Sequence, residues 1–288
     1  MFAQLFGYYL LDKNIISTEQ LNEALVNKNI YKEKLGSLFT TAGYMTPEQV
    51  EYLHREQKHF DKKIGDIAVF LGFLTRRQME ELLDRQDNDD TAFGEALVSK
   101  GYVTRAEYEN LLRAYRQELG LTNDINDKNN LKKDLISIYN LDESEDIYAD
   151  YAALFVRNSI RFVGDDFAFA SFQPEREGEQ ECVIYQDITG AENLHTAICG
   201  SQKAFNAFAS RCTGKATYKC SHSDVGDFLN LQNSLYAANR FASDGSKLTL
   251  GQAAYSENEW LSSRDDRLII PLSFTFGKIY IYIYRSAS

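Results

Sequence analysis

One acidic and one amide side chain stand three residues apart in the stretch from Asp224 to Asn233. They are Asp227 and Asn230, and apolar residues lie between them. On an α-helix, residues at i and i+3 lie on the same face. A carboxylate can hold a cation or a proton, and a carboxamide can hold a water molecule by donating and accepting hydrogen bonds. Hydrolysis of a phosphoryl group requires both abilities. The alternative is a solvated helix face without chemistry, where such pairs also occur by chance.

The region around this pair, from Tyr148 to Tyr284, resembles the CheC/CheX/FliY family of chemotaxis phosphatases, and CheX most closely. The resemblance covers about half of the chain. The family signature is a helix with Glu-x-x-Asn, preceded by a small residue and an acid. Residues 224–230 read Asp-Val-Gly-Asp-Phe-Leu-Asn at this place, so Asp227 stands where the family has glutamate. Ser234 stands where a glycine is usual.

Two later segments carry the same resemblance. Residues 248–251, Leu-Thr-Leu-Gly, are similar to the family's strand after the signature helix. Residues 268–272 and 277–281 are similar to its closing β-hairpin. The resemblance implies an α+β fold with an antiparallel sheet for the second half of the chain.

The resemblance also implies a partner and an activity. The partner is a CheY-like response regulator receiver, and the activity is hydrolysis of its aspartyl-phosphate. Asn230 would orient the attacking water, and Asp227 would hold the receiver's lysine. The receiver would supply Mg²⁺, so we expect no cofactor of the chain's own and no metal ligands in it. The alternative is a non-catalytic adaptor whose CheX-like domain serves docking or dimerisation.

The first half of the chain contains a repeat with a constant step of 29 residues. A glycine after an apolar or aromatic residue returns at Gly7, Gly36, Gly65 and Gly94. Seven positions later come Asn14, Gly43, Gly72 and Gly101, and three positions after these come Ser17, Thr46, Thr75 and Thr104. The second glycine, or the asparagine, suits the left-handed position that ends a helix. The Ser or Thr suits the N-cap of the next helix. We therefore predict an all-α repeat domain of four helix-turn-helix units in residues 1–120.

These units resemble the N-terminal domain of type II secretion and MSHA-pilus ATPases, over residues 5–116. In the MshE type (MshEN), two tandem motifs joined by a short spacer bind cyclic di-GMP. The closest copies here are residues 34–57 and 63–86, and both begin with lysine. The nucleotide-binding positions that the resemblance implies are Lys34, Leu35, Gly36, Gly43, Gln57, Lys63, Ile64, Gly65, Gly72 and Gln86. The alternative is a helical docking module whose glycines serve only turns and close packing.

The composition limits the remaining classes of function. A chain of 288 residues is long enough to form two domains. The net charge of −11 argues against duplex nucleic acid as a partner. No apolar run approaches the ~18 residues of a membrane span, and the first residues do not form a signal peptide, so we expect a cytoplasmic protein. The four cysteines lack the CxxC spacing of zinc or redox sites, which favours buried thiols.

The joint between the halves is residues 121–146, a polar linker in which residues 131–138 form a short amphipathic helix. The CheX-like domain follows in residues 147–288. The pattern predicts helices over 148–162, 201–211 and 223–239, and strands over 166–173, 182–187 and 192–199. Residues 278–284 alternate strictly between isoleucine and tyrosine after Lys278. We expect the isoleucines to face helices and the tyrosines to face a solvated surface or a partner, with a homodimer through this sheet as one alternative.

Overall fold

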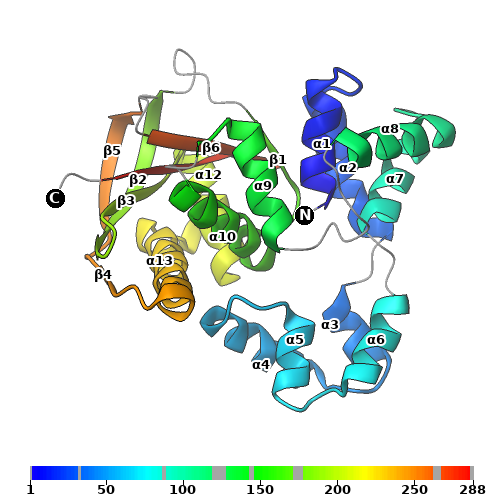
Figure 1. Cartoon of the computed structure of the whole chain (residues 1–288), viewed down its shortest axis with the longest axis horizontal. Helices are drawn as coiled ribbons and strands as arrows, with labels where there is room; N and C mark the ends of the chain where they lie inside the picture. Colours follow the sequence, from blue (N-terminus) through cyan, green and yellow to red (C-terminus); the bar gives the residue numbers. More distant parts are fainter. Residues whose placement is uncertain are drawn as a thin grey trace.

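The computed structural model describes residues 2–31, 34–85, 89–118, 128–142, 146–170, 178–261 and 267–285. Within these residues the chain forms twelve α-helices and a seven-stranded antiparallel sheet. Figure 1 shows the sheet and its helices on one side of the molecule and the helices of the first half on the other. None of the described helices is both long and apolar enough to cross a lipid bilayer.

The first half is helical, as predicted. Its helices are α1 (Phe2–Asp12), α2 (Thr18–Tyr31), α3 (Leu35–Thr41), α4 (Pro47–Glu56), α5 (Ile64–Phe70), α6 (Arg76–Arg85), α7 (Asp89–Ser99) and α8 (Arg105–Glu118). A 3-10 turn, η1 (Gln57–His59), follows α4.

The turns between these helices have the predicted left-handed residue. The backbone φ angle is 55° at Asn14 and 71°, 77° and 71° at Gly43, Gly72 and Gly101. The predicted caps are also present. Each cap forms a reciprocal pair with the residue three positions later: the side chain of each residue accepts a hydrogen bond from the backbone N–H of the other. The pairs are Ser17 with Gln20, Thr46 with Gln49, Thr75 with Gln78 and Thr104 with Glu107. These local features therefore recur at every step of the sequence pattern.

The first glycine of each unit lies directly against the second helix of the same unit. A Cβ atom built on Gly7 would lie 2.5 Å from Leu21, and one on Gly94 would lie 2.6 Å from the ring of Tyr108. A Cβ atom built on Gly36 would lie 3.0 Å from Val50, and one on Gly65 would lie 2.7 Å from Met79. Each contact joins residues fourteen positions apart. A larger side chain at any of these positions would push the two helices apart.

The helices of the first half bury two separate cores. Phe6 of α1 contacts Phe93 of α7 and Tyr108 of α8, with ring centroids 6.4 and 5.8 Å apart. This core continues into the sheet of the second half. Residues 34–85 have a smaller core of their own, which includes Phe39, Leu53 and Ile67 and other apolar side chains of α3 to α6.

The second half contains helices α9 (Lys128–Tyr139), α10 (Asp146–Phe162), α12 (Gln202–Thr213) and α13 (His222–Asp244). Its strands are β1 (Phe167–Phe169), β2 (Glu179–Gly190), β3 (Leu194–Gly200), β4 (Leu248–Leu250), β5 (Ala254–Trp260), β6 (Arg267–Phe274) and β7 (Gly277–Arg285). The strand order is β1-β6-β7-β3-β2-β4, and β5 also pairs with β2. The predicted helices and the closing hairpin are confirmed. Strand β5 was not predicted, and residues 171–173 of the first predicted strand lie outside the described residues.

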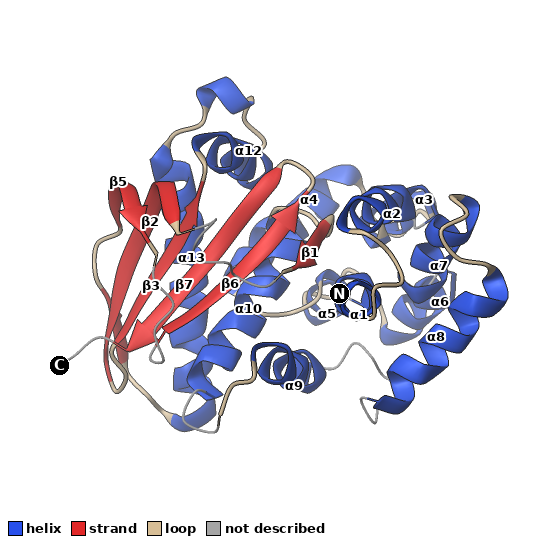
Figure 2. Cartoon of the chain, turned by 90° about the horizontal axis from the view of Figure 1, so that it is seen from above, coloured by secondary structure: helices blue, strands red, loops and turns tan. Residues whose placement is uncertain are grey.

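The two faces of β7 differ as its alternation predicts. Ile279, Ile281 and Ile283 are buried in the core beneath α10, α12 and α13, which lie on one side of the sheet in Figure 2. The tyrosines lie on the opposite face, but Tyr280 and Tyr282 are only 5% and 7% exposed. They belong to a third apolar cluster, with Val183, Ala197, Cys199, Leu261 and Ile269. The expectation that these two tyrosines face solvent or a partner was therefore wrong, because apolar side chains of this same chain surround them.

The carboxylate of Asp61 connects residues 34–85 to the second half. Asp61, just after η1, accepts two hydrogen bonds from Arg157 of α10, at 3.1 and 2.7 Å. Arg161 of the same helix lies 2.8 Å from Asp61. Asn239 of α13 donates to Asp61 at 3.2 Å. The Asp61 side chain is 4% exposed, so this contact is a buried connection to α10 and α13.

Candidate functional site

The position of the Asp-x-x-Asn pair depends on how helix α13 begins. Asp224, in the first turn, accepts a hydrogen bond from the backbone N–H of Ser221 at 2.8 Å. Lys215 pairs with Asp224 at 2.5 Å. The hydrogen bond from Lys215, followed by the backbone bond from Ser221, holds the pKa of Asp224 below its usual value. A charged carboxylate at this place accepts a hydrogen bond from a backbone N–H that the helix itself leaves without an acceptor, and its negative charge interacts favourably with the helix dipole. Both effects stabilise the first turn of α13, which precedes Asp227.

Asp227 and Asn230 lie together on an exposed face of α13, as predicted. Both line a depression of about 450 Å³ between this helix and strand β2. The segment from Gly251 to Tyr255, which runs from the end of β4 into β5, forms the other side of the depression. Figure 1 shows α13 beside β4, the strand that leads into this segment. An acid and an amide therefore face a shared, solvent-accessible hollow.

The amide of Asn230 is held by a buried glutamine from the sheet. Gln186 of β2 donates through its Nε2 to Oδ1 of Asn230 at 3.1 Å and to the backbone carbonyl of Gly251 at 2.7 Å. Only 2% of Gln186 is exposed. One residue of the sheet thus connects the site helix to the loop on the far side of the depression.

Behind Gln186 the polar contacts continue into the core. Asn233 donates to Oε1 of Gln186 at 2.8 Å and to Oγ1 of Thr196 at 2.9 Å. The hydroxyl of Tyr151 donates to Oδ1 of Asn233 at 2.6 Å. Thr196 donates to the backbone carbonyl of Gln186 at 2.8 Å. This set of residues links α10, β2, β3 and α13 below the exposed Asn230, and each buried polar group in it has a partner.

An aromatic pair forms the other end of the depression. The rings of His222 and Tyr255 stack with their centroids 3.7 Å apart and an interplanar angle of 14°. Nε2 of His222 lies 3.3 Å from the side-chain oxygen of Gln202. Burial raises the pKa of the Tyr255 phenol beyond its ordinary range, and hydrogen bonding to Cys182 and Glu257 adds to this effect. At neutral pH Tyr255 is therefore a neutral flank of the site.

Sequence reasoning missed Gln186, although the strand pattern contains a signal for it. Residues 184, 186 and 188 of a strand point to the same face. Ile184 and Ile188 are buried, so a glutamine between them stands at an inward position. A polar residue at such a position needs buried partners, and Asn233 and Gly251 provide them.

No group of three or more His, Cys, Asp or Glu side chains that could hold a metal ion occurs among the described residues. All four cysteines are free; Cys182 and Cys199 are buried, whereas Cys212 and Cys220 are partly exposed. The prediction of buried thiols is therefore confirmed for two of the four.

The positions predicted for nucleotide binding lie in the smaller core unit. Lys34 and Lys63 are exposed and precede α3 and α5. The two motif starts adjoin, because a methyl group of Leu35 lies 3.4 Å from the place of a Cβ on Gly65. Ile64, like Leu35, is partly buried against the same core.

The remaining predicted positions have other surroundings. Gly36 and Gly65 contact the second helices of their units, and Gly43 and Gly72 lie in the left-handed turns. Gln57 is buried and donates to the carbonyl of Lys62 at 2.9 Å. Gln86 lies outside the described residues.

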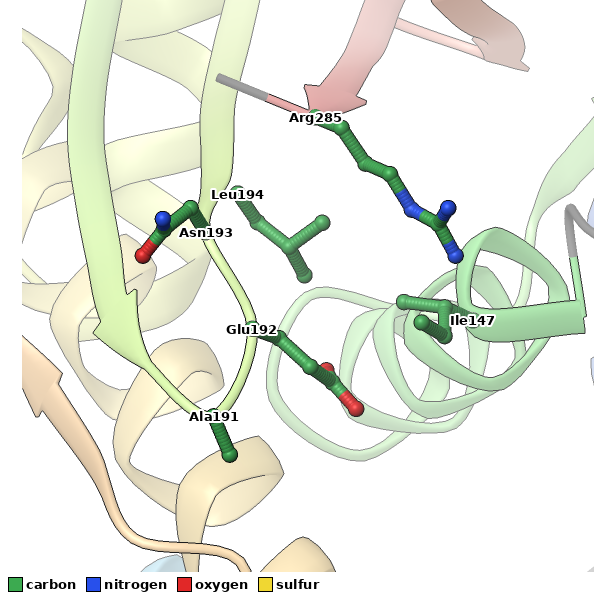
Figure 3. A pocket seen from close by; sticks show the side chains of 6 residues that line it. All are labelled: Ile147, Ala191, Glu192, Asn193, Leu194 and Arg285. Carbon is green, nitrogen blue, oxygen red and sulfur yellow. The ribbon is translucent and has the colours of Figure 1, made fainter. Parts of the chain in front are cut away.

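A second cavity, of about 370 Å³, lies at the turn between β2 and β3 (Figure 3). It is lined by Ile147, Ala191, Glu192, Asn193, Leu194 and Arg285. Glu192 accepts a hydrogen bond from Tyr236 at 2.7 Å and pairs with Arg240 at 2.5 Å. None of the residues predicted to do chemistry lines this cavity, and the contacts of Glu192 tie this turn to α13.

No protein-family model and no curated protein matches the chain. Solved structures that are similar to about half of the chain are those of CheX- and CheC-like chemotaxis proteins. A CheC-like superfamily protein from Shewanella sp. PV-4 has 11% identity and a TM-score of 0.41, over 49% of this chain and 97% of that one. A CheX from Desulfovibrio desulfuricans has 12% identity and a TM-score of 0.38, over 49% and 99% of the two chains. The CheX of a CheX-CheY-BeF3-Mg+2 complex from Borrelia burgdorferi has 11% identity and a TM-score of 0.37, over 47% and 96%.

Proposed function

We propose that this chain is a cytoplasmic signalling protein that docks on a phosphorylated CheY-like receiver and speeds hydrolysis of its aspartyl-phosphate. The observation that carries the proposal is the pairing of exposed Asp227 and Asn230 on one face of α13, at the edge of a depression, with Asn230 held from below by Gln186. An amide with a fixed orientation in an open hollow suits the positioning of a water molecule beside an incoming phosphoryl group.

In this reaction, water attacks the phosphorus and the bond from phosphorus to the aspartyl oxygen breaks. The aspartate leaves as a carboxylate, and the protons of the water pass to inorganic phosphate and to solvent. Asn230 holds the attacking water, and Asp227 holds the lysine of the receiver. The Mg²⁺ belongs to the receiver. Positioning and electrostatic stabilisation supply the rate, as in other phosphoryl transfers.

We further propose a division of labour within the chain. Residues 1–120 form the regulatory repeat domain of four helix-turn-helix units, residues 121–146 form the linker, and residues 147–288 form the CheX-like domain. Cyclic di-GMP is the proposed ligand of the second and third units. The adjoining starts of their motifs, at Leu35 and Gly65, support this proposal.

The alternative function is a non-catalytic adaptor. Aspartate at position 227 is one methylene shorter than the glutamate of the resembled signature, which favours binding without turnover. In this case the CheX-like domain serves docking or dimerisation, and the repeats bind the nucleotide or a partner protein.

The deciding experiment follows the loss of phosphate from purified CheY-like receivers that have been phosphorylated with acetyl phosphate and Mg²⁺. The full chain is compared with Asn230→Ala, and with Asn110→Ala on the exposed surface of α8 as a matched control. We expect the wild-type protein to accelerate hydrolysis and Asn230→Ala to lose at least about tenfold of that acceleration, or about 1.4 kcal/mol of transition-state stabilisation. Binding without acceleration would favour the adaptor.

A further inference from the structure

We propose that Gln186 is a positioning residue, which fixes the Asn230 amide with its oxygen turned into the protein and its NH₂ group turned outward. The inference rests on the proposed function, because it says which end of the amide meets the phosphoryl group. Gln186 itself is buried beneath Asn230 at the floor of the depression, so we assign it a role that acts through Asn230.

The first anchor of this orientation is the backbone carbonyl of Gly251. A carbonyl oxygen only accepts hydrogen bonds, so the Gln186 atom 2.7 Å from it must be the Nε2 donor. The second proton of the same NH₂ group points toward Asn230, at a heavy-atom distance of 3.1 Å. Asn230 must therefore present its oxygen there, because two NH₂ groups would face each other otherwise.

A second anchor, the backbone carbonyl of Gln186, leads to the same result. The hydroxyl of Thr196 has one proton and donates it to this carbonyl, at 2.8 Å. The hydroxyl oxygen of Thr196 must therefore accept a hydrogen bond from Asn233. The NH₂ group of Asn233 thus faces Thr196, and its other proton meets Gln186 at 2.8 Å. Gln186 must show Asn233 its oxygen, which leaves its nitrogen for Asn230 and Gly251.

Burial makes this order of donors and acceptors difficult to reverse. Asn233 and Thr196 are completely buried, and Tyr151 closes the far end of the set through the oxygen of Asn233. Turning one amide would leave buried polar groups unpaired, and an unpaired buried polar group is costly because it has lost its hydrogen bonds to water. The outward NH₂ group of Asn230 can then donate to a phosphoryl oxygen, where negative charge develops, and the second lone pair of its Oδ1 can accept from the attacking water.

The test replaces the donor with an acceptor. In Gln186→Glu the charged carboxylate cannot donate to Gly251 or to Asn230, so the Asn230 amide should turn its NH₂ group inward. We expect kcat for receiver dephosphorylation to fall at least tenfold, with KM for the phosphorylated receiver within about twofold of wild type. Acidification should restore part of kcat in this variant, because a protonated carboxyl can donate again. Gln186→Leu, the matched control, should lose activity without any recovery in acid.

A second measurement reads the orientation in the free protein and needs no receiver. Side-chain amide signals are assigned by comparing ¹⁵N spectra of wild type, Asn230→Ala and Gln186→Leu. The NH₂ protons of Gln186 and Asn233 should exchange slowly with solvent, and those of Asn230 quickly. Slow exchange at Asn230, or unchanged kcat in both Gln186 variants, overturns the inference. If the wild-type chain does not accelerate hydrolysis, the proposed function fails, and the exchange measurement still decides how Asn230 is held.

Discussion

Asp61 and Arg157 form a two-pronged ion pair, with nitrogen-to-oxygen distances of 3.1 and 2.7 Å, that joins the smaller helical core to helix α10. Asp61→Ala would remove the carboxylate that pairs with both Arg157 and Arg161 in a largely buried setting. We expect it to destabilise the docked state by about 3–5 kcal/mol, as in other broken buried pairs. Hydrogen exchange should show loss of protection in α10 and the C-terminal half of α13. The control is Asp84→Ala, an exposed acid in the same unit, and equal protection in both variants would contradict the prediction.

The repeat glycines make a second prediction, which separates close packing from turn conformation. Gly94→Ala places a methyl group against the ring of Tyr108, at 2.6 Å, and overpacking of this kind costs about 1–3 kcal/mol. Gly72→Ala meets no atoms but must adopt a φ of 77°, which costs about 1–2 kcal/mol. Gly72→Asn should cost less, because Asn14 takes a φ of 55° at the same position of its unit. Urea denaturation measures all three, and equal costs for Ala and Asn at position 72 would argue against this account.

Asp134 of α9 should make stability depend on pH. It is 7% exposed, and burial raises its pKa to about 6. The unfolded chain has an aspartate pKa of about 3.9, so the folded protein holds this proton more tightly. The free energy of unfolding therefore includes the full contribution of this tighter proton binding below about pH 4. The contribution is lost as the pH rises to about 6, and stability changes little with pH above that. Asp134→Asn should be more stable than wild type by about 1–3 kcal/mol at pH 8, and the difference should shrink at pH 5. A difference that does not change with pH would sink the prediction.

The length of the acid at position 227 offers a test of catalysis. Asp227→Glu restores the longer side chain of the resembled signature. If reach limits the pairing with the receiver's lysine, kcat/KM for dephosphorylation should rise, and Asp227→Asn should lower it by removing the charge. The same phosphate-release assay measures both. An unchanged rate in Asp227→Glu means that the aspartate already reaches its partner.

Cyclic di-GMP binding is tested by calorimetry on the full chain. Lysine at positions 34 and 63 provides a point charge where arginine would provide a planar fork. We expect modest binding that Lys34→Arg with Lys63→Arg tightens and the two alanine variants weaken, whereas Lys247→Arg in the second half changes nothing. No heat at about 100 μM, where an interaction of about −5.5 kcal/mol is half saturated, would leave the docking module as the role of these units.

Local sequence signals predicted the helices and turns of this chain well, because each depends on residues close together. Asn14 and Thr46, for example, act within one turn of the backbone. The Asp-x-x-Asn face was predictable for the same reason. Contacts between distant residues were not predictable in this way. The link from Gln186 to Asn230 spans 44 residues, and no period of the sequence encodes it.

Two errors have the same origin. Strand β5, which pairs with β2, carries several polar and charged residues, so it lacks the apolar alternation that marks a half-buried strand. The tyrosines of β7 alternate correctly, but the alternation says only that they share a face. Whether that face is covered depends on residues such as Leu261 and Val183, which lie elsewhere in the chain.

The division of the helices into two cores has a consequence for the order of folding. The smaller core draws all of its buried side chains from residues 38–82, so it can close as soon as that short stretch has left the ribosome. The first two helices must wait for later residues. Lys28 of α2 pairs with Asp165 at 2.8 Å, and α1 lies against β1, which pairs with β6. Contacts so distant along the chain form slowly, because a long loop must close before they stabilise anything. The middle of the first half should therefore fold early during synthesis, whereas the contacts of its flanks with the sheet wait for the last strands.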